Sequence, residues 1–385
     1  MRDVVIVSGV RTAIGRLGGT LKDFIPAKLG AIAIKEAVQR AGIAGDQVDE
    51  VIMGSINQTE PTGNPARVAL LEAGLPIEVP AHTVCKNCAS GLKSITLGAL
   101  EIMAGQADII VAGGQESMSQ TPHVLRGARF GYRMGHAKAS DFLLDILEGM
   151  GWTAENVADR WNVTREEMDQ FGLRSQERAL HAIEQGYFKE QIVPAAIPQR
   201  KGDPVIFEVD EGPRATTMEA LAKLRPAFRK DGRVTAGNSS QINDGAAAVV
   251  LMSAEKAAEL GKKPMARVIG WASAGVDPDI MGMGPVPAVR KVMAKTGLTV
   301  ADMDIIELNE AFAAQSIACM RDLEMDPEKV NVNGGAISLG HPVGASGAIL
   351  TVKAMYELER RQARYALVTL CIGGGQGLAA IFERV

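Results

Sequence analysis

Two distant stretches of the chain share the same order of apolar and polar positions. In each stretch, at 41–54 and 296–309, a helix end with glycine leads through a short acidic linker into an apolar strand. An Ala-Ser-Gly tripeptide follows in both, at 89–91 and 345–347, so the matched positions lie about 255 residues apart. A shared order at one long offset indicates two duplicated domain halves rather than a short repeat.

Each tripeptide starts a predicted helix whose apolar positions recur every three to four residues. The apolar stripes are Leu92, Ile95, Ala99, Ile102 and Met103 in the first half, and Ala348, Ile349, Val352, Met355 and Leu358 in the second. Each helix gives way to an apolar strand that ends in glycines, at 108–114 and 365–375. Helices that alternate with buried strands predict a layered α/β fold, and we expect the halves to pack around a pseudo-twofold axis.

A segment of different character separates the two halves. Residues 118–242 are richer in charge, Met, Pro and aromatic residues and have no counterpart elsewhere in the chain. A capping box at Thr164 and Glu167 predicts an amphipathic helix over about 164–186. We expect an inserted loop domain that covers the active site and binds the distal part of a substrate. The domains are then 1–117, completed by about 243–264, the insert 118–242, and 265–385.

Composition narrows the class of protein. The chain of 385 residues is 46% apolar and 22% charged, with a formal net charge of −4. These values are typical of soluble globular proteins, and acids and bases are mixed along the chain, so we expect no nucleic-acid or membrane partner. The apolar run at residues 1–8 reads as a buried strand and is too short for a signal peptide or a membrane span. We therefore expect a cytoplasmic protein.

The cysteines raise the question of a redox or metal dithiol. Only Cys85, Cys88, Cys319 and Cys371 occur, which is sparse for a disulfide framework. A structural zinc site usually has four nitrogen or sulfur ligands, and a second CxxC pair is missing, so we expect no metal. We expect Cys85 to be a buried neighbour of Cys88, and a disulfide between them remains the alternative.

Two residues stand where the duplicated helices begin. Cys88 directly precedes the first helix, where free N–H groups and the helix dipole favour a thiolate. His341 lies between Gly340 and Pro342 in a glycine-rich loop before the second helix, and a neutral imidazole there could take a thiol proton. A buried apolar cysteine and an ordinary core or surface histidine are the alternatives.

Two further residues end strands of the second half. Cys371 closes an apolar strand before three glycines, Gly373 among them, whose N–H groups are free to meet a ligand. Asn309 follows another strand, and its amide could hold a water or a substrate oxygen. A structural cysteine and a helix N-cap are the alternatives. Pseudosymmetry should bring the four side chains together.

Six motifs in this order resemble those of the thiolase family, and the resemblance covers essentially the whole chain. The motifs are "VCKNCASGLKS" (84–94), "GGQESMS" (113–119), "TAGNSSQINDGAAA" (235–248), "NEAFA" (309–313), "GGAISLGHPVGASG" (334–347) and "CIGGGQG" (371–377). The resemblance implies a layered αβαβα fold. It also implies reversible acyl transfer between coenzyme A thioesters, by condensing two acetyl-CoA to acetoacetyl-CoA or by thiolytic cleavage of 3-ketoacyl-CoA.

The resemblance also implies roles for the candidate residues. Cys88 would carry the acyl group and His341 would activate it, while Cys371 would exchange a proton with the α-carbon of acetyl-CoA. His341 and a water held by Asn309 would stabilise the enolate oxygen, and the N–H groups of Cys88 and Gly373 would form a second oxyanion hole. No metal or redox cofactor is implied, because a thioester already acidifies its α-carbon.

Substrate contacts and assembly follow from the same resemblance. The substrates would be acetyl-CoA, 3-ketoacyl-CoA and coenzyme A, and family members are homodimers or homotetramers. Ser240 would meet the pantetheine and Arg214 a phosphate. The residues expected to line the tunnel are Met150, Phe228, Ala311 and Phe312.

Some positions depart from the family's pattern. Asn87 stands directly before Cys88, where thiolases usually have an apolar residue, and Cys85 stands where Asn is common. Gly149 precedes Met150, where acetoacetyl-specific members often carry His. The alternatives are a non-catalytic thiolase-fold protein that binds acyl-CoA or lipid, a decarboxylating condensing enzyme, and a dithiol redox protein.

Overall fold

One mixed sheet forms the centre of the molecule. The computed structural model describes residues 2–58 and 62–385, without the side chains of 145–148. Within those residues the sheet has eleven strands, of which the short β2 (Gly15–Arg16) pairs with β11 and β8 (Ile192–Val193) with β1. From edge to edge the others are β13 (Ile305–Leu308), β14 (Tyr365–Ile372), β15 (Gln376–Arg384), β12 (Ala266–Gly275), β1 (Val4–Thr12), β11 (Asn243–Ser253), β5 (Ile109–Ser117), β3 (Glu50–Gly54) and β4 (Ala81–Val84).

The strand order repeats around the middle of the sheet. β13 is parallel to β14, as β3 is to β5, and β14 is antiparallel to β15, as β5 is to β11. The two sets meet where Val5 and Ile6 of β1 pair with Arg267 and Ala266 of β12. The duplicated order agrees with the prediction from the repeated motifs. The edge-to-edge pairing that joins the halves into one sheet is a feature that no motif reveals.

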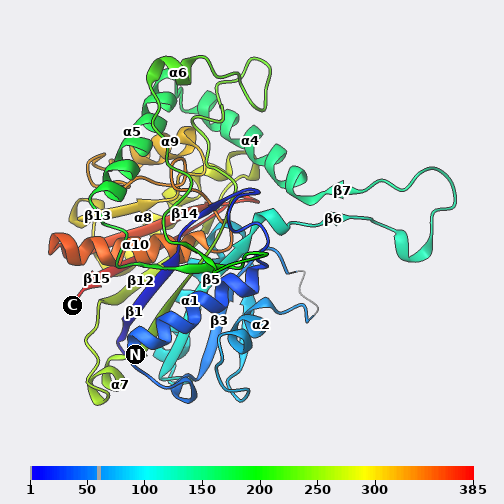
Figure 1. Cartoon of the computed structure of the whole chain (residues 1–385). Coiled ribbons are helices and arrows are strands. Elements are labelled where there is room, and N and C mark those ends of the chain that lie inside the picture. Colours follow the sequence, from blue (N-terminus) through cyan, green and yellow to red (C-terminus); the bar gives the residue numbers. More distant parts are fainter. Residues whose placement is uncertain (1, 59–61) are drawn as a thin grey trace.

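Helices complete the predicted layers (Figure 1). α1 packs on β11, β5 and β1, and α8 packs on β12 and β15, while α3 and α10 lie between the halves and contact strands of both. The apolar stripes of α3 and α10 are buried in the core, apart from the partly buried Met103. The helices are α1 (Pro26–Ala41), α2 (Pro65–Glu72), α3 (Ser90–Met103), α4 (Phe142–Arg160), α5 (Arg165–Glu184), α6 (Met218–Ala222), α7 (Ala254–Glu259), α8 (Pro285–Thr296), α9 (Ala313–Asp322) and α10 (Ser346–Arg361).

Glycines let the two central helices touch at their N-terminal ends. A Cβ atom on Gly91 of α3 would lie 2.8 Å from the backbone nitrogen of Ala348 in α10, and one on Gly347 would meet Leu92. Real Cβ atoms essentially never come that close, so both positions require glycine for this packing. The repeated Ala-Ser-Gly tripeptide therefore brings the loops that precede α3 and α10 side by side.

The segment between β5 and β11 builds most of the upper part of Figure 1. α4 and α5 pack against α9 of the second half, and α5 begins at the predicted capping box of Thr164 and Glu167. An arm with β6 (His123–Val124) and β7 (Ser140–Asp141) projects from the body (Figure 1). A hairpin of β9 (Ala195–Ile197) and β10 (Val205–Phe207) follows. The domain limits at 117 and 243 remain a proposal, which the end of β5 and the start of β11 support.

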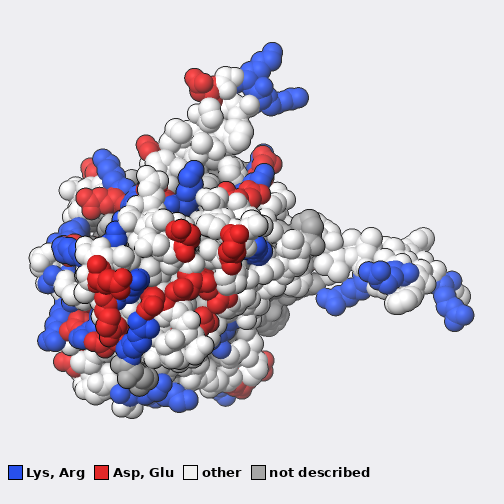
Figure 2. Space-filling model, turned by 90° about the horizontal axis from the view of Figure 1, so that it is seen from below, with Lys and Arg blue, Asp and Glu red and all other residues white. Residues whose placement is uncertain are grey.

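Charge is distributed unevenly over the surface. Figure 2 shows acidic and basic side chains mixed over the body, whereas the projecting arm carries basic ones. Residues 124–140 contain four basic residues and no Asp or Glu. The expected mixing of charge along the chain is therefore wrong for this arm. No helix in the described part of the chain has the length and apolar character needed to span a bilayer.

Candidate active site

Cys88 lies in a tight turn at the start of α3. A 3₁₀ turn over Asn87–Ala89 leads directly into the helix, and Asn87 adopts a left-handed φ of 45° that Asn tolerates better than most residues. The Ser90 hydroxyl accepts from Lys86 N–H at 2.8 Å and donates to the Asn87 carbonyl at 2.7 Å, which holds the turn. The predicted helix start after Cys88 is confirmed.

The surroundings of the Cys88 sulfur favour the protonated thiol. Burial raises the pKa of Cys88, and hydrogen bonds from the N–H groups of Gly373 and of Cys88 itself oppose that rise. Desolvation disfavours a charged sulfur more than these two N–H groups favour it, so the pKa of Cys88 is raised. The expectation of a favoured thiolate in the resting protein is therefore wrong. A base has to take the proton as the sulfur attacks.

Cys371 lies near the end of β14 and is fully buried. Burial raises the pKa of Cys371 well above its usual range, and the neighbouring sulfurs of Cys88 and Cys319 raise it further. The resting group is thus a thiol that can give up a proton only to a strongly basic partner. The turn that carries Cys88 packs against β14, so the first and second halves each contribute a thiol to one region.

His341 is buried and held in one orientation. Its backbone N–H donates to Asn243 Oδ1 at 2.9 Å, and its Nδ1 lies 2.6 Å from the hydroxyl of Ser346. That hydroxyl donates its single proton to the Pro342 carbonyl at 2.9 Å, so we assign the imidazole proton to Nδ1 and a lone pair to Nε2. Burial lowers the pKa of His341 to about 4, which keeps the imidazole neutral. A neutral imidazole with a lone pair on Nε2 can accept a thiol proton.

Asn309 follows β13 and faces the same imidazole. Its Nδ2 lies 3.5 Å from His341 Nε2, at the long limit of a hydrogen bond. Its carbonyl accepts from Gln315 Nε2 at 3.1 Å, which fixes the residue. The alternative role as helix N-cap does not hold, because α9 begins at Ala313 and Phe312 is its N-cap. Asn309 and His341 therefore present polar groups to one point.

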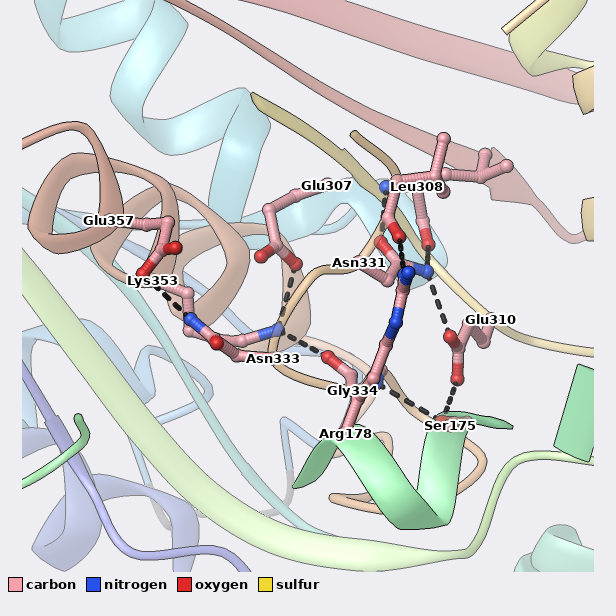
Figure 3. Close-up of polar contacts among 12 residues, drawn as sticks. Ser175, Arg178, Glu307, Leu308, Glu310, Asn331, Asn333, Gly334, Lys353 and Glu357 are labelled. Atoms are coloured by element: carbon pink, nitrogen blue, oxygen red, sulfur yellow. Dashed lines mark hydrogen bonds and ion pairs between the residues drawn. The ribbon is translucent and has the colours of Figure 1, made fainter. Parts of the chain in front are cut away.

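A buried polar network surrounds Glu310, the residue after Asn309 (Figure 3). Glu310 accepts from Ser175 Oγ at 2.6 Å, from Asn331 Nδ2 at 2.9 Å and from the Ile337 N–H at 3.1 Å. Burial raises the pKa of Glu310, and these hydrogen bonds oppose the rise. Glu310 thereby ties the strand end that carries Asn309 to the loop that leads to His341.

A buried ion pair lies in the same network (Figure 3). Lys353 of α10 bonds Glu307 of β13 at 2.8 Å and the Gly334 carbonyl at 2.8 Å. The sequence did not single out Glu310, Lys353 or Ser346. The position of Glu310 beside Asn309 and of Ser346 in the repeated tripeptide were the only available signals.

A line of side chains runs outward from Gly373. A Cβ atom on Gly373 would lie 3.2 Å from the sulfur of Met150, and one on Gly151 would meet the ring of Phe228. The rings of Phe228 and Phe312 meet edge to face with centroids 6.1 Å apart. Met150, Phe228 and Phe312 are thus neighbours, and their role in lining a tunnel stays a prediction.

The remaining expected substrate contacts differ in position. Ala311 precedes Phe312, and its carbonyl accepts from the Ser240 N–H at 2.9 Å, so both residues continue this line. Arg214 is exposed on the loop before α6, where its backbone N–H donates to Gln176 of α5. The structure thus groups five of the six expected contacts and leaves Arg214 at the surface.

Cys85 is exposed, so the expectation of a buried neighbour is wrong. The chain leaves the edge strand β4 at Val84, and its next residues turn toward the surface before Cys88. Across the described residues, no group of three or more His, Cys, Asp or Glu side chains is arranged to hold a metal ion.

Comparison with known proteins defines the class. Thiolase, N-terminal domain, matches residues 4–255, and Thiolase, C-terminal domain, matches 262–384. The chain therefore belongs to the thiolase family.

Individual relatives are similar over their whole length. An acetyl-CoA acetyltransferase of Syntrophomonas wolfei is 54% identical over 393 residues, which cover 99% of each chain. The crystal structure of the Bacillus anthracis acetyl-CoA acetyltransferase has a TM-score of 0.98 at 47% identity and covers 100% of this chain and 99% of that one. Human mitochondrial 3-ketoacyl-CoA thiolase in complex with CoA has a TM-score of 0.96 at 43% identity, with 100% and 98% covered.

Proposed function

We propose that the chain is a thiolase that transfers acyl groups reversibly between coenzyme A thioesters through an acyl–Cys88 intermediate. The observation that carries the proposal is the grouping of two thiols with a neutral imidazole and an amide. The turn that carries Cys88 packs against β14, which carries Cys371, and against α10, whose Ser346 orients His341 beside Asn309. The named activities of the full-length relatives support an acyltransferase over a non-catalytic acyl-CoA or lipid carrier.

The first half of thiolysis uses the resting protonation states. The Cys88 sulfur attacks the 3-keto carbon of a 3-ketoacyl-CoA while its proton passes to His341 Nε2. The bond between the α-carbon and the keto carbon then breaks, which leaves an acyl–Cys88 thioester and the enolate of acetyl-CoA. Cys371 protonates the α-carbon of that enolate and becomes a thiolate. The raised pKa of Cys371 fits this step, because the thiol is retained until a carbon base appears.

The second half returns every proton. The Cys371 thiolate takes the proton of an incoming coenzyme A thiol, whose sulfur attacks the acyl–Cys88 carbonyl. The bond between Cys88 and the acyl group breaks, and protonated His341 gives its proton back to the Cys88 sulfur. Condensation of two acetyl-CoA molecules is the same sequence in reverse. The chemistry uses only these side chains and the substrates, so we propose that no metal or redox cofactor takes part.

Hydrogen-bond donors stabilise the oxygens that gain charge. In the proposal, the N–H groups of Cys88 and Gly373 receive the oxygen of the acyl group bound to Cys88. Protonated His341 and a water on Asn309 receive the enolate oxygen. Each such donor typically contributes about 3–4 kcal/mol of barrier reduction. The orientation of His341 by Ser346 supports this role, since the proton taken from Cys88 stays on Nε2.

We further propose that coenzyme A reaches this centre beneath the insert 118–242. The line of Met150, Phe228 and Phe312 supports an apolar channel, with Ser240 and Ala311 beside the pantetheine. Arg214, exposed at the rim, would then meet a phosphate. Acetyl-CoA and longer 3-ketoacyl-CoA remain equally proposed substrates, and a cytoplasmic location is proposed with them.

We propose a homodimer or homotetramer as the working assembly. Phe130 and Met134 on the projecting arm are 91% and 94% exposed, more apolar surface than an isolated arm normally leaves in water. Light scattering should give a mass of two or four chains. If the arm joins copies, the F130S/M134S variant should dissociate further than the parent.

Variants at the two thiols test the mechanism. Both C88A and C371A should lose about 10²–10⁴-fold in steady-state thiolysis of acetoacetyl-CoA. Of the two variants, only C371A can form an acyl adduct on Cys88, because it keeps the nucleophile. Thiolysis by C88A at the parental rate would reject the proposal.

A further inference from the structure

Asn87 is a polar residue directly before the proposed nucleophile Cys88. Its left-handed backbone turns the side-chain amide toward the second half of the molecule, and Nδ2 donates to the Gly373 carbonyl at 2.8 Å. The amide thus links the nucleophile's turn to the turn that joins β14 and β15.

That second turn is anchored at one end by Gly375, whose carbonyl accepts from the Val276 N–H at 2.7 Å. Residues 373–375 are three successive glycines, and Gly374 and Gly375 have positive φ values of 91° and 82°. Glycine leaves a backbone with the greatest conformational freedom, so the position of this turn depends on bonds to its neighbours. Two such bonds come from the nucleophile's turn: Asn87 holds the Gly373 carbonyl, and Lys86 Nζ lies 2.9 Å from Gln376 Oε1.

Gly373 also makes the contact that bears on the chemistry. Its backbone N–H group is near enough to the sulfur of Cys88 to lower the pKa of the thiol against the effect of burial. The carbonyl and the N–H of one residue are therefore engaged by adjacent residues, Asn87 and Cys88. A movement of the glycine turn away from Asn87 would move the donor away from the sulfur.

We propose that Asn87 is a positioning residue that holds the Gly373 N–H on Cys88 and thereby tunes acyl transfer in this chain. The inference rests on the proposed acyl–Cys88 chemistry. Asn87 acts through Gly373 and takes no proton itself. Its amide makes a hydrogen bond across the two halves.

Two substitutions separate the effect of the Asn87 side-chain amide from the effect of its backbone conformation. N87D keeps the shape and a residue type that tolerates positive φ, but its carboxylate cannot donate to the Gly373 carbonyl. N87G keeps the backbone conformation without strain and removes the side chain. C85S is the matched control, because Cys85 is an exposed residue in the same loop. Thermal unfolding of each variant establishes that it is folded before its rates are compared.

The first readout needs no substrate. Iodoacetamide alkylation of Cys88 is followed against pH by mass spectrometry, and trypsin separates Cys88 in peptide 87–93 from Cys85 in peptide 68–86. In both Asn87 variants the pH midpoint for Cys88 should rise, because a loosened Gly373 N–H stabilises the thiolate less. The midpoint should be unchanged in C85S.

The second readout is the rate at which acetyl-CoA acylates Cys88. Loss of an oxyanion donor costs about 10²–10³-fold, so loosening one should slow acylation about tenfold in both variants, with KM nearly unchanged. The inference would be overturned if the rates of acylation and of alkylation of Cys88 in N87D and N87G stayed within twofold of those in the parent. Slow acylation with an unchanged alkylation midpoint would also overturn it, since Asn87 would then act on the substrate. If the parent forms no acyl–Cys88, the proposed function fails, while the alkylation midpoints still test the link to Gly373.

Discussion

Replacement of Lys353 by methionine should destabilise the folded chain strongly. Lys353 Nζ and Glu307 Oε2 are 2.8 Å apart, and their side chains are only 2% and 1% exposed. At that distance an effective dielectric constant of about 20 gives an attraction of about 6 kcal/mol. Methionine keeps the length of the lysine stem but leaves the carboxylate buried without its cation. Breaking a buried pair in this way costs about 3–5 kcal/mol, which is the loss we expect.

The loss should depend on pH through Glu307. Burial raises the pKa of Glu307, and Lys353 opposes the rise. Without Lys353, the pKa in the folded state moves further above its value in the unfolded chain. A carboxyl group whose pKa is higher in the folded state than in the unfolded state costs no stability at a pH below its pKa in the unfolded state. It destabilises the folded state progressively as the pH rises toward its pKa in the folded state. K353M should therefore lose more stability relative to the parent at about pH 8 than at about pH 5.

Urea unfolding followed by circular dichroism measures both effects. The double variant K353M/E307Q should recover a large part of the loss, because it leaves no charge buried. K189M is the matched control, since Lys189 is exposed, and it should change stability by less than about 0.5 kcal/mol. A loss in K353M no larger than in K189M, or one that grows as pH falls, would refute the reasoning.

Three further outcomes are expected. S346A should lower kcat for thiolysis about 10-fold or more with little change in KM, because His341 loses the partner that orients Nδ1. An unchanged kcat would contradict that role of Ser346. Burial lowers the pKa of His341 to about 4, so in a plot of kcat/KM against pH the midpoint of the acid limb should lie well below the ordinary histidine pKa. A midpoint near pH 6.5 would contradict a buried neutral imidazole. G91A should lose both stability and activity, since its Cβ would lie 2.8 Å from the Ala348 nitrogen. In the control variant G149A nothing lies within 4 Å of the added Cβ, so calorimetry should show little change in its stability.

The duplicated architecture was visible in the sequence because it repeats a local pattern. The Ala-Ser-Gly tripeptides mark the starts of α3 and α10, and their apolar stripes are buried. The joining of the halves was not visible. It rests on the short pairing of β1 with β12 at the middle of the sheet, and two paired residues leave no periodic signal.

The reactive side chains were visible for a similar reason, since each stands beside a glycine or at a strand end. Their supporting groups were hidden. Lys353 reads as a polar residue on a helix, and only the fold places Glu307 beside it. The state of Cys88 was also beyond local reasoning, because the helix end favours a thiolate while burial by distant segments outweighs it. Cys85 was misplaced because neighbours in sequence can face opposite ways in a turn.

The direct test of acyl transfer is the mass of peptide 87–93 after brief incubation with acetyl-CoA and acid quenching. We expect the mass of one acetyl group on Cys88 in the parent, its release on addition of coenzyme A, and no such group in C88A. An unmodified peptide 87–93, or an acetyl group found on Cys85 instead, would contradict the proposed intermediate.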